Sequence, residues 1–562
     1  MRGCSGCGGD AVFDVEALEI LVESFIVIIP AETLSTKEPK RHGLARLSKQ
    51  SRLWNDVTSS TYINVSDLTR LVMSQSWPHA LDDPEALVRV SQRMAEQYQE
   101  PFIYDLERKA SITEQDDPNY YSRLPRSLIT TSDIQSFTTG TGFSIYASIG
   151  PLLEETEHEL ILVTCFWASS TSRDALNAVL RKLSDKAVRR GTEKIRVRIC
   201  FSSSSIFQKL FHKQSATGQT YSRTEWVKTF GLPDPSELGG LDLKIKSVFV
   251  LPFSVMHPKF IIVDRQVVVL PSCNVSWEEW FEGAVTMTGP ITSQFLKFYW
   301  TFWERRTEMP ANLPGEKRGY PVPGTAHDGS RTLSSACQTT AEFPKQTPTF
   351  FLPSPHRRNP NFQPFGAATA PTTPLNAFLL TLFAKAERSI RIQTPNLTAP
   401  PVLSALLKAL ARGIDVIILT SARLMILEQL VTAGTTTSRC VKTLIKRYKA
   451  LDPKASSRPY DEEAAMTPAK VGRLRISYFE PRHGYKKKGE EQGEPQQSHL
   501  KMTIVDGEVL VLGSGNLDRA SWFTSQELGV AFLDEDVVKE VEKTVDKAMA
   551  GRSTVVFNSD AR

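Results

Sequence analysis

The sequence lacks a long apolar run, a disulfide-like cysteine pattern and a strong charge of either sign. The apolar stretch at residues 17–29 contains Glu19 and Glu23 and ends at Pro30, which is too short for a membrane span. Seven cysteines are an odd, scattered set, which argues against a disulfide-stapled secreted protein. A net charge of +5 over 562 residues suits anionic membranes or nucleic acid and is diagnostic of neither. We therefore expect an intracellular protein, either cytoplasmic or peripherally membrane-associated.

One motif is present twice. Both copies read H-x-K-x4-D, and each is followed at the same offset by a Ser and an Asn. The residues are His257, Lys259, Asp264, Ser272 and Asn274 in the first copy, and His499, Lys501, Asp506, Ser514 and Asn516 in the second. A single short motif is weak evidence, but two copies with matching Ser and Asn residues are not plausibly chance.

Each copy predicts a β-hairpin that carries polar groups to one place. The apolar stretches 260–263 and 267–270 are separated by a short polar turn, and the second copy repeats this at 502–505 and 509–512. Strand alternation puts the His and the Lys on one face. Each copy would thus present an imidazole, an ammonium, a hydroxyl and an amide together.

This set of groups suits a phosphodiester. A neutral imidazole can attack phosphorus, and a second, protonated imidazole can protonate the leaving alkoxide. Two lysines and two asparagines would surround the phosphate oxygens, so we expect no metal and no cofactor. Because one copy supplies only one His, both copies must face a single centre.

These residues resemble the phospholipase D superfamily, whose signature is a pair of such HKD motifs. The resemblance implies that His257 attacks, that His499 is the general acid, and that Asp264 and Asp506 orient or tune the imidazoles. It further implies that the lysines and asparagines bind phosphate with support from Ser272 and Ser514. The residues alone leave open which His attacks.

The second half is the closer match and adds Glu527, which Glu282 answers at a different offset from the Asn. We include both glutamates among the candidate substrate- or phosphate-binding residues. The first half departs at Pro271, where the family usually has Gly. Because proline fixes φ and removes a donor, the shape of that phosphate loop is in question.

A second duplication supports the first. Helix, strand, helix and strand patterns precede each motif, with strands at 159–164 and 195–200 in the first half and at 389–393 and 414–419 in the second. This predicts an α/β protein with two similar α/β/α sandwich lobes of the phospholipase D fold, related by a pseudo-twofold axis, with the active site between them. The predicted segments are an N-terminal extension and start of lobe one (1–130), lobe one (131–307), a Pro/Ser/Thr-rich linker (308–365) and lobe two (366–562).

The predicted function is a phospholipase D-type phosphodiesterase or phosphatidyltransferase that acts on glycerophospholipids at a membrane surface, as a monomer with an internal pseudo-dimer. The first alternative is a nuclease of the same superfamily, against which the modest positive charge weighs. The second is a non-catalytic phosphate-binding scaffold. The polar insertion at 482–497 is interpreted as a solvated loop, or as one that gates the site.

Overall fold

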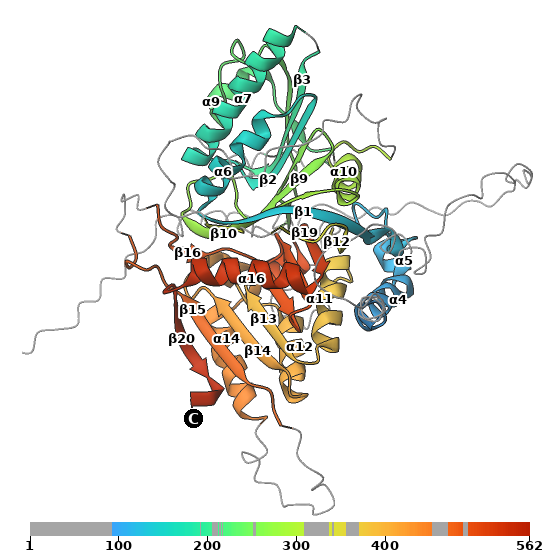
Figure 1. The fold of residues 1–562 in the computed structure, drawn as a ribbon, viewed down its shortest axis with the longest axis vertical. Helices are drawn as coiled ribbons and strands as arrows, with labels where there is room; N and C mark the ends of the chain where they lie inside the picture. The colour runs from blue at the N-terminus through green and yellow to red at the C-terminus, as the bar shows by residue number, and fades with distance from the viewer. Residues whose placement is uncertain are drawn as a thin grey trace, which may run out of the picture.

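The chain forms two lobes joined through one continuous sheet (Figure 1). The computed structural model describes residues 93–561, apart from 192, 205–211, 213, 214, 216, 251–253, 308–336, 340, 341, 356–369, 452–469 and 487–492. The apolar stretch at 17–29 lies outside these residues.

Lobe one, which is uppermost in Figure 1, is a mixed sheet covered by helices. Its main elements are β1 (Ile129–Gly140), α6 (Gly142–Glu154), β2 (Glu159–Phe166), α7 (Thr171–Arg190), β3 (Ile195–Ser203), α9 (Arg223–Phe230), β5 (Leu241–Ser247), β8 (Phe260–Val263), β9 (Val267–Pro271), β10 (Trp280–Thr288) and α10 (Ile291–Phe302). Its shorter strands are β4 (Gln219–Thr220), β6 (Phe249–Val250) and β7 (Ser254–Val255).

Lobe two repeats this plan. Its main elements are β12 (Thr347–Ser354), α11 (Pro374–Lys385), β13 (Ser389–Gln393), α12 (Pro400–Ala411), β14 (Asp415–Thr420), α13 (Ile426–Ala433), α14 (Thr437–Lys449), β15 (Leu474–Phe479), β17 (Met502–Val505), β18 (Val509–Gly513), α15 (Arg519–Phe523), β19 (Glu527–Leu533), α16 (Glu535–Met549) and β20 (Ser553–Asn558). Smaller elements of the chain are η1 (Ala95–Gln99), α4 (Glu100–Arg108), α5 (Ala110–Thr113), η2 (Pro125–Leu128), β11 (Cys337–Gln338), β16 (Gln497–Ser498) and η5 (Ser559–Ala561).

The strand order confirms the predicted duplication. Lobe one runs β1-β10-β9-β8-β2-β3-β5 and lobe two runs β12-β19-β18-β17-β13-β14-β15, with the same parallel and antiparallel pairings. The first helix of each lobe even begins alike, since Thr141 and Thr373 accept hydrogen bonds from the backbone N–H groups of Ser144 and Asn376. The seven main strands and the first helix of each lobe are therefore equivalent.

The pseudo-twofold relation is visible where the equivalent strands β1 and β12 meet. They pair antiparallel, with Ile129 opposite Phe350 and Ser132 opposite Thr347, while the rest of β1 pairs with β10. Because an antiparallel pair of equivalent strands is itself two-fold symmetric, this pairing sets the lobes in opposite orientations.

Two sequence expectations for the segment boundaries differ from the structure. The region 308–365, predicted as a linker, contains β12, whose Phe350, Phe351 and Leu352 are buried between the lobes. Its prolines misled the prediction, because Pro348 and Pro353 lie near the two ends of the strand, where the ladder tolerates them.

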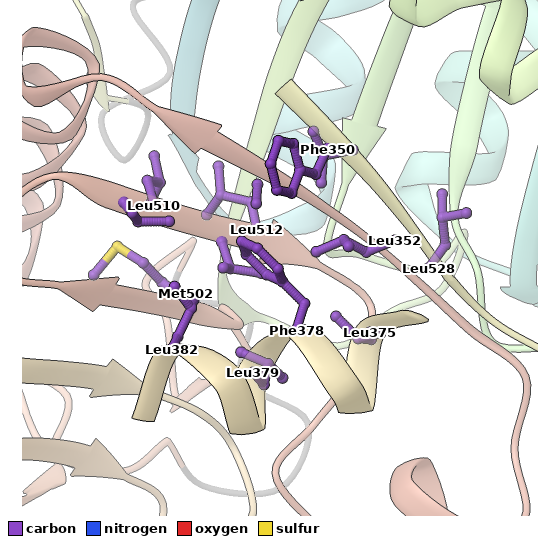
Figure 2. Close-up of a cluster of buried hydrophobic side chains, with 14 of the residues drawn as sticks. Phe350, Leu352, Leu375, Phe378, Leu379, Leu382, Met502, Leu510, Leu512 and Leu528 are labelled. Carbon is purple, nitrogen blue, oxygen red and sulfur yellow. The ribbon is translucent and has the colours of Figure 1, made fainter. Parts of the chain in front are cut away.

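The segment before lobe one packs on lobe two. Phe102 of α4 lies edge-on to Phe378 of α11, with the ring centroids 5.1 Å apart, and it stacks near Phe350. Figure 1 shows α4 beside α11. Figure 2 shows the core that α11 covers, in which Phe378 and Leu382 lie with Met502 of β17 and with Leu510 and Leu512 of β18.

No helix in the described part of the chain has both the length and the apolar composition that a membrane crossing requires.

Candidate active site

The two motifs meet because each begins against a strand of the other lobe. The backbone N–H of His257 donates to the carbonyl of Gln526, just before β19, at 2.9 Å. The backbone N–H of His499 donates to the carbonyl of Phe281 in β10 at 2.8 Å. These two bonds are equivalent under the pseudo-symmetry, so the starts of β8 and β17 face one centre between the lobes.

Each motif histidine is held by a glutamate of the opposite lobe. His257 Nδ1 lies 2.8 Å from Glu527 Oε2, and His499 Nδ1 lies 2.7 Å from Glu282 Oε1. The side chains of both glutamates and of His499 are at most 3% exposed, whereas that of His257 is 14% exposed. With Nδ1 occupied by a carboxylate, Nε2 is the nitrogen that each ring can use for chemistry.

The two motif lysines are buried beside the imidazoles. Lys259 Nζ donates to the carbonyl of His257 at 2.9 Å, and Lys501 Nζ donates to the carbonyl of His499 at 2.6 Å. Both lysines are essentially inaccessible to solvent. Two ammonium groups in a buried centre create a local preference for an anion, as phosphate binding requires.

The motif asparagines lie at the ends of β9 and β18. Asn516 Nδ2 donates to Asp518 Oδ2 at 3.1 Å. Within the residues that the structure describes, Asn274 Oδ1 and Asn516 Oδ1 are buried without a hydrogen-bond partner. A buried polar atom without a partner costs free energy, and because an amide oxygen only accepts hydrogen bonds, these two atoms are suited to an O–H or N–H group of a bound ligand and not to its phosphate oxygens.

Asp264 and Asp506 are placed differently from what the resemblance implied. Asp264 accepts backbone hydrogen bonds from residues 157, 158 and 159 at 2.7–2.8 Å, at the far end of β8 from His257. Asp506 accepts the same bonds from residues 387–389 and one from the hydroxyl of Tyr98. Because a four-residue strand spans about 13 Å, neither aspartate reaches an imidazole. Asp264 instead holds the start of β2, and Asp506 holds the start of β13.

The orienting role falls to Glu282 and Glu527, which the sequence suggested as substrate- or phosphate-binding residues. A buried carboxylate repels phosphate, whereas it is a natural partner for an imidazole N–H. The predicted supporting serines hold these glutamates. Ser272 Oγ donates to Glu282, and Ser514 Oγ donates to Glu527 Oε2 at 2.5 Å.

The phosphate loop of lobe one keeps its shape despite Pro271. The backbone N–H of Ser272 donates to the carbonyl of Gly283 at 2.8 Å, as that of Ser514 does to the carbonyl of Leu528 at 2.9 Å. Because Pro271 is the last residue of β9, the loop's own donors are untouched.

Two side chains at this centre were not among the predicted site residues. Ser521 Oγ donates to Glu527 Oε1 at 2.7 Å, and the sequence signal for Ser521 was its place in the second-half match to the phospholipase D superfamily. The ring of Trp280 lies against His499, with centroids 4.6 Å apart, whereas the symmetry-related position beside His257 is Ser525. The two imidazoles therefore have different surroundings.

Burial dominates the electrostatics of the site. Burial lowers the pKa of His257 below its ordinary value, against the opposing effect of Glu527. Burial lowers the pKa of His499 to about 3, against the effect of Glu282. Burial would raise the pKa of both glutamates, but the histidines and lysines beside them outweigh it and lower it. Neutral imidazoles thus face ionised carboxylates, with a hydrogen on Nδ1 and a lone pair on Nε2.

Burial also lowers the pKa of Lys501 to about 7, and the neighbouring Lys259 adds to the effect while Glu282 opposes it. Two adjacent buried ammonium groups disfavour one another, so Lys501 is only partly protonated near neutral pH.

Comparison with known proteins agrees with this geometry. Residues 379–549, which cover lobe two from α11 to the end of α16, match the family profile described as "Cardiolipin synthase, PLD-like domain". Lobe one repeats the same strand order and motif. The chain is a phospholipase D superfamily protein. The comparison with curated proteins found no match.

Several solved structures are similar to this phospholipase D superfamily chain. The phosphatidylserine synthase of Haemophilus influenzae Rd KW20 is 14% identical, with 77% of this chain and 91% of that chain covered and a TM-score of 0.46. The phospholipase D family member Nuc from Salmonella typhimurium is 17% identical, with 32% and 90% covered and a TM-score of 0.22. The polyphosphate kinase of Porphyromonas gingivalis is 10% identical, with 73% and 48% covered and a TM-score of 0.36.

Proposed function

We propose that this protein is a phospholipase D-type phosphodiesterase or phosphatidyltransferase that removes or exchanges the headgroup of a glycerophospholipid. The observation that carries the proposal is the pair of crossed imidazole–carboxylate contacts, His257 with Glu527 and His499 with Glu282, in one buried centre with two lysines. The phospholipid class rests on the cardiolipin synthase description of the family profile that lobe two matches.

In the first step, His257 Nε2 attacks phosphorus. A nitrogen–phosphorus bond forms, the bond from phosphorus to the headgroup oxygen breaks, and His499 Nε2 donates a proton to that oxygen. Because burial keeps His499 neutral, His499 must take up a proton from solvent as the substrate binds, and the negative charge of the bound phosphodiester favours this uptake. Glu527 stabilises the positive charge that develops on His257 during attack.

In the second step, His499 acts as a general base. Its Nε2, now neutral, takes a proton from water or from an acceptor alcohol, whose oxygen attacks phosphorus and releases His257. Water gives phosphatidic acid, and an alcohol gives a new phosphatidyl ester. Lys259 and Lys501 stay near the phosphate oxygens throughout, where they offset the charge of the transition state.

The assignment of attack to His257 follows from the different surroundings of the two rings. His257 is the more exposed of the pair, whereas His499 is covered by Trp280. A group that must bond to phosphorus needs an open approach, while a proton donor needs only its Nε2–H directed at the leaving oxygen.

Product analysis tests the proposal. The purified protein is incubated with mixed phospholipids, a primary alcohol and EDTA, in parallel with His257→Ala and Glu279→Gln. We expect a phosphatidyl alcohol from the wild type and from Glu279→Gln, and none from His257→Ala. Glu279 is the control because its carboxylate binds Lys486 and not an imidazole. Cleavage of single-stranded DNA without any lipid product would replace the proposed substrate with nucleic acid. No turnover of either class would favour a phosphate-binding scaffold.

A further inference from the structure

Helix α13 of lobe two has its polar and apolar sides reversed. The residues it buries are Gln429 and Thr432, whereas Ile426 and Leu430 are 38% and 37% exposed. A helix on the surface of a soluble protein normally buries its apolar side chains and exposes its polar ones. The exposed apolar side of α13 is therefore suited to contact an apolar partner and not water.

Gln429 fixes this orientation. Its Nε2 donates to Asn396 Oδ1 at 2.9 Å and to the carbonyl of Leu424 at 2.6 Å. Its Oε1 accepts from the backbone N–H of Thr437 at 2.6 Å and from its hydroxyl at 2.9 Å. A buried amide with this many partners cannot leave its place without losing them, so the apolar side of α13 is held outward.

The helix lies beside the catalytic centre. Ser421, which precedes it, donates to the carbonyl of Ser498 at 3.2 Å, and Ser498 is the neighbour of His499. Helix α13 also packs against α15, which lies in the chain between Asn516 and Glu527. The outward apolar side chains therefore border the site on the lobe two side.

Lobe one borders the site with apolar side chains as well. Trp277 follows Asn274 by three residues, is 48% exposed and meets Phe166 edge-on with centroids 5.8 Å apart. Phe143 is 37% exposed in the first turn of α6, next to Gly142, which lies close to Cys273 and Asn274.

We propose that α13, together with Trp277 and Phe143, forms a docking face that rests on a phospholipid bilayer and presents the site to its surface. Each lobe contributes exposed apolar side chains from an element that adjoins the site residues, as an interfacial surface around the site requires. The exposed Arg423 and Arg439 complement anionic headgroups, and the hydrogen bond from Ser438 Oγ to the Ala422 carbonyl holds the two arginines' segments together. This inference rests on the proposed lipid activity, which requires a substrate taken from a membrane.

The experiment is vesicle co-sedimentation of the full chain. The proteins are wild type, the double variant Ile426→Ser/Leu430→Ser, and Val188→Ser as the matched control. Val188 is 64% exposed near the end of α7, a helix of 20 residues that carries it about 26 Å from the start of the helix. Vesicles of phosphatidylcholine, with and without phosphatidylglycerol, are the probe, and turnover of a soluble short-chain phospholipid below its micelle concentration is measured in parallel.

We expect wild type and Val188→Ser to bind the mixed vesicles equally. The double variant should bind at least about tenfold more weakly, because it loses the two aliphatic side chains that enter the bilayer on binding. Turnover of the monomeric substrate should be the same for all three proteins.

Equal vesicle binding by the double variant, or no binding by the wild type, would overturn the proposal. So would a wild-type dimer in light scattering that the double variant abolishes, since a second copy would then cover the face. Failure of all lipid turnover, with vesicle binding still lost only in the double variant, would overturn the proposed function and leave the docking face standing.

Discussion

Glu527→Gln is the most informative substitution in this site, because it removes one charge and leaves the packing nearly unchanged. Glu527 receives three contacts, from His257 Nδ1 at 2.8 Å, Ser514 Oγ at 2.5 Å and Ser521 Oγ at 2.7 Å. Its carboxylate has two accepting oxygens, whereas the glutamine amide has one oxygen and one NH2 group. The two serine hydroxyls each contact a different oxygen, so at least one of the three contacts must change.

The chemical consequence is a wrong tautomer. If the glutamine NH2 faces His257, it donates to Nδ1, and the ring hydrogen moves to Nε2, which removes the lone pair needed for attack. The positive charge that develops on the ring also loses its partner. Comparable substitutions of a histidine's carboxylate cost on the order of 10^3–10^4 in rate, or about 4–5.5 kcal/mol in the barrier.

The assay is the burst of released headgroup alcohol in rapid-quench experiments, because it reports attack separately from later release. We expect the burst rate of Glu527→Gln to fall about 10^3–10^4-fold, while Glu279→Gln stays within about threefold of wild type. Both variants should unfold at nearly the wild-type urea concentration. A Glu527→Gln burst within about tenfold of wild type would refute the idea that this carboxylate sets the state of His257.

Three further predictions follow from the same contacts. Lys501 loses its proton as pH rises through about 7, so kcat/KM should fall above that pH, and Lys501→Arg should extend activity to higher pH; an unchanged upper limb would contradict the assignment. Asp264→Asn gives up at least one of three backbone hydrogen bonds, so urea unfolding should show a free energy of unfolding lower by about 2–3 kcal/mol, with kcat close to wild type. A large loss of kcat in protein of normal stability would instead assign Asp264 to the catalytic centre. His499→Ala should regain most of the rate of the first step, measured as the burst of released p-nitrophenol, on a lipid whose headgroup is p-nitrophenol, because that leaving group needs no proton; equal losses of the burst rate on poor and good leaving groups would argue against a general acid.

The fold was largely predictable because each lobe carries its own periodic signal. The helix at 171–190 buries Leu176, Val179, Leu180 and Leu183, the spacing that the sequence showed. The strand at 389–393 was placed correctly for the same reason. The strand β12 was missed, since its two prolines gave the pattern of a linker, and only the neighbouring β1 and β19 make it a strand.

The sequence predicted which residues form the site, but not which histidine contacts which glutamate. Repetition in the sequence identified both histidines and both lysines, and the family resemblance added Glu527 with Glu282 as its counterpart. Neither gave a sign that His257 belongs with Glu527 and His499 with Glu282. That exchange depends on the antiparallel meeting of β1 and β12, which places each motif against the other lobe's strand. The motif aspartates were misassigned for a related reason. Their spacing from the histidine is one strand length, so they lie at the opposite end of the hairpin.

Identification of the covalent intermediate tests the central claim most directly. His499→Ala is mixed with the p-nitrophenyl phospholipid, quenched in alkali, where a phosphohistidine survives, and digested for peptide mass spectrometry. The account predicts a phosphatidyl adduct on the peptide that contains His257, and no adduct when His257→Ala is treated in the same way. An adduct on a residue other than His257, or turnover by His257→Ala at the wild-type rate, would contradict it.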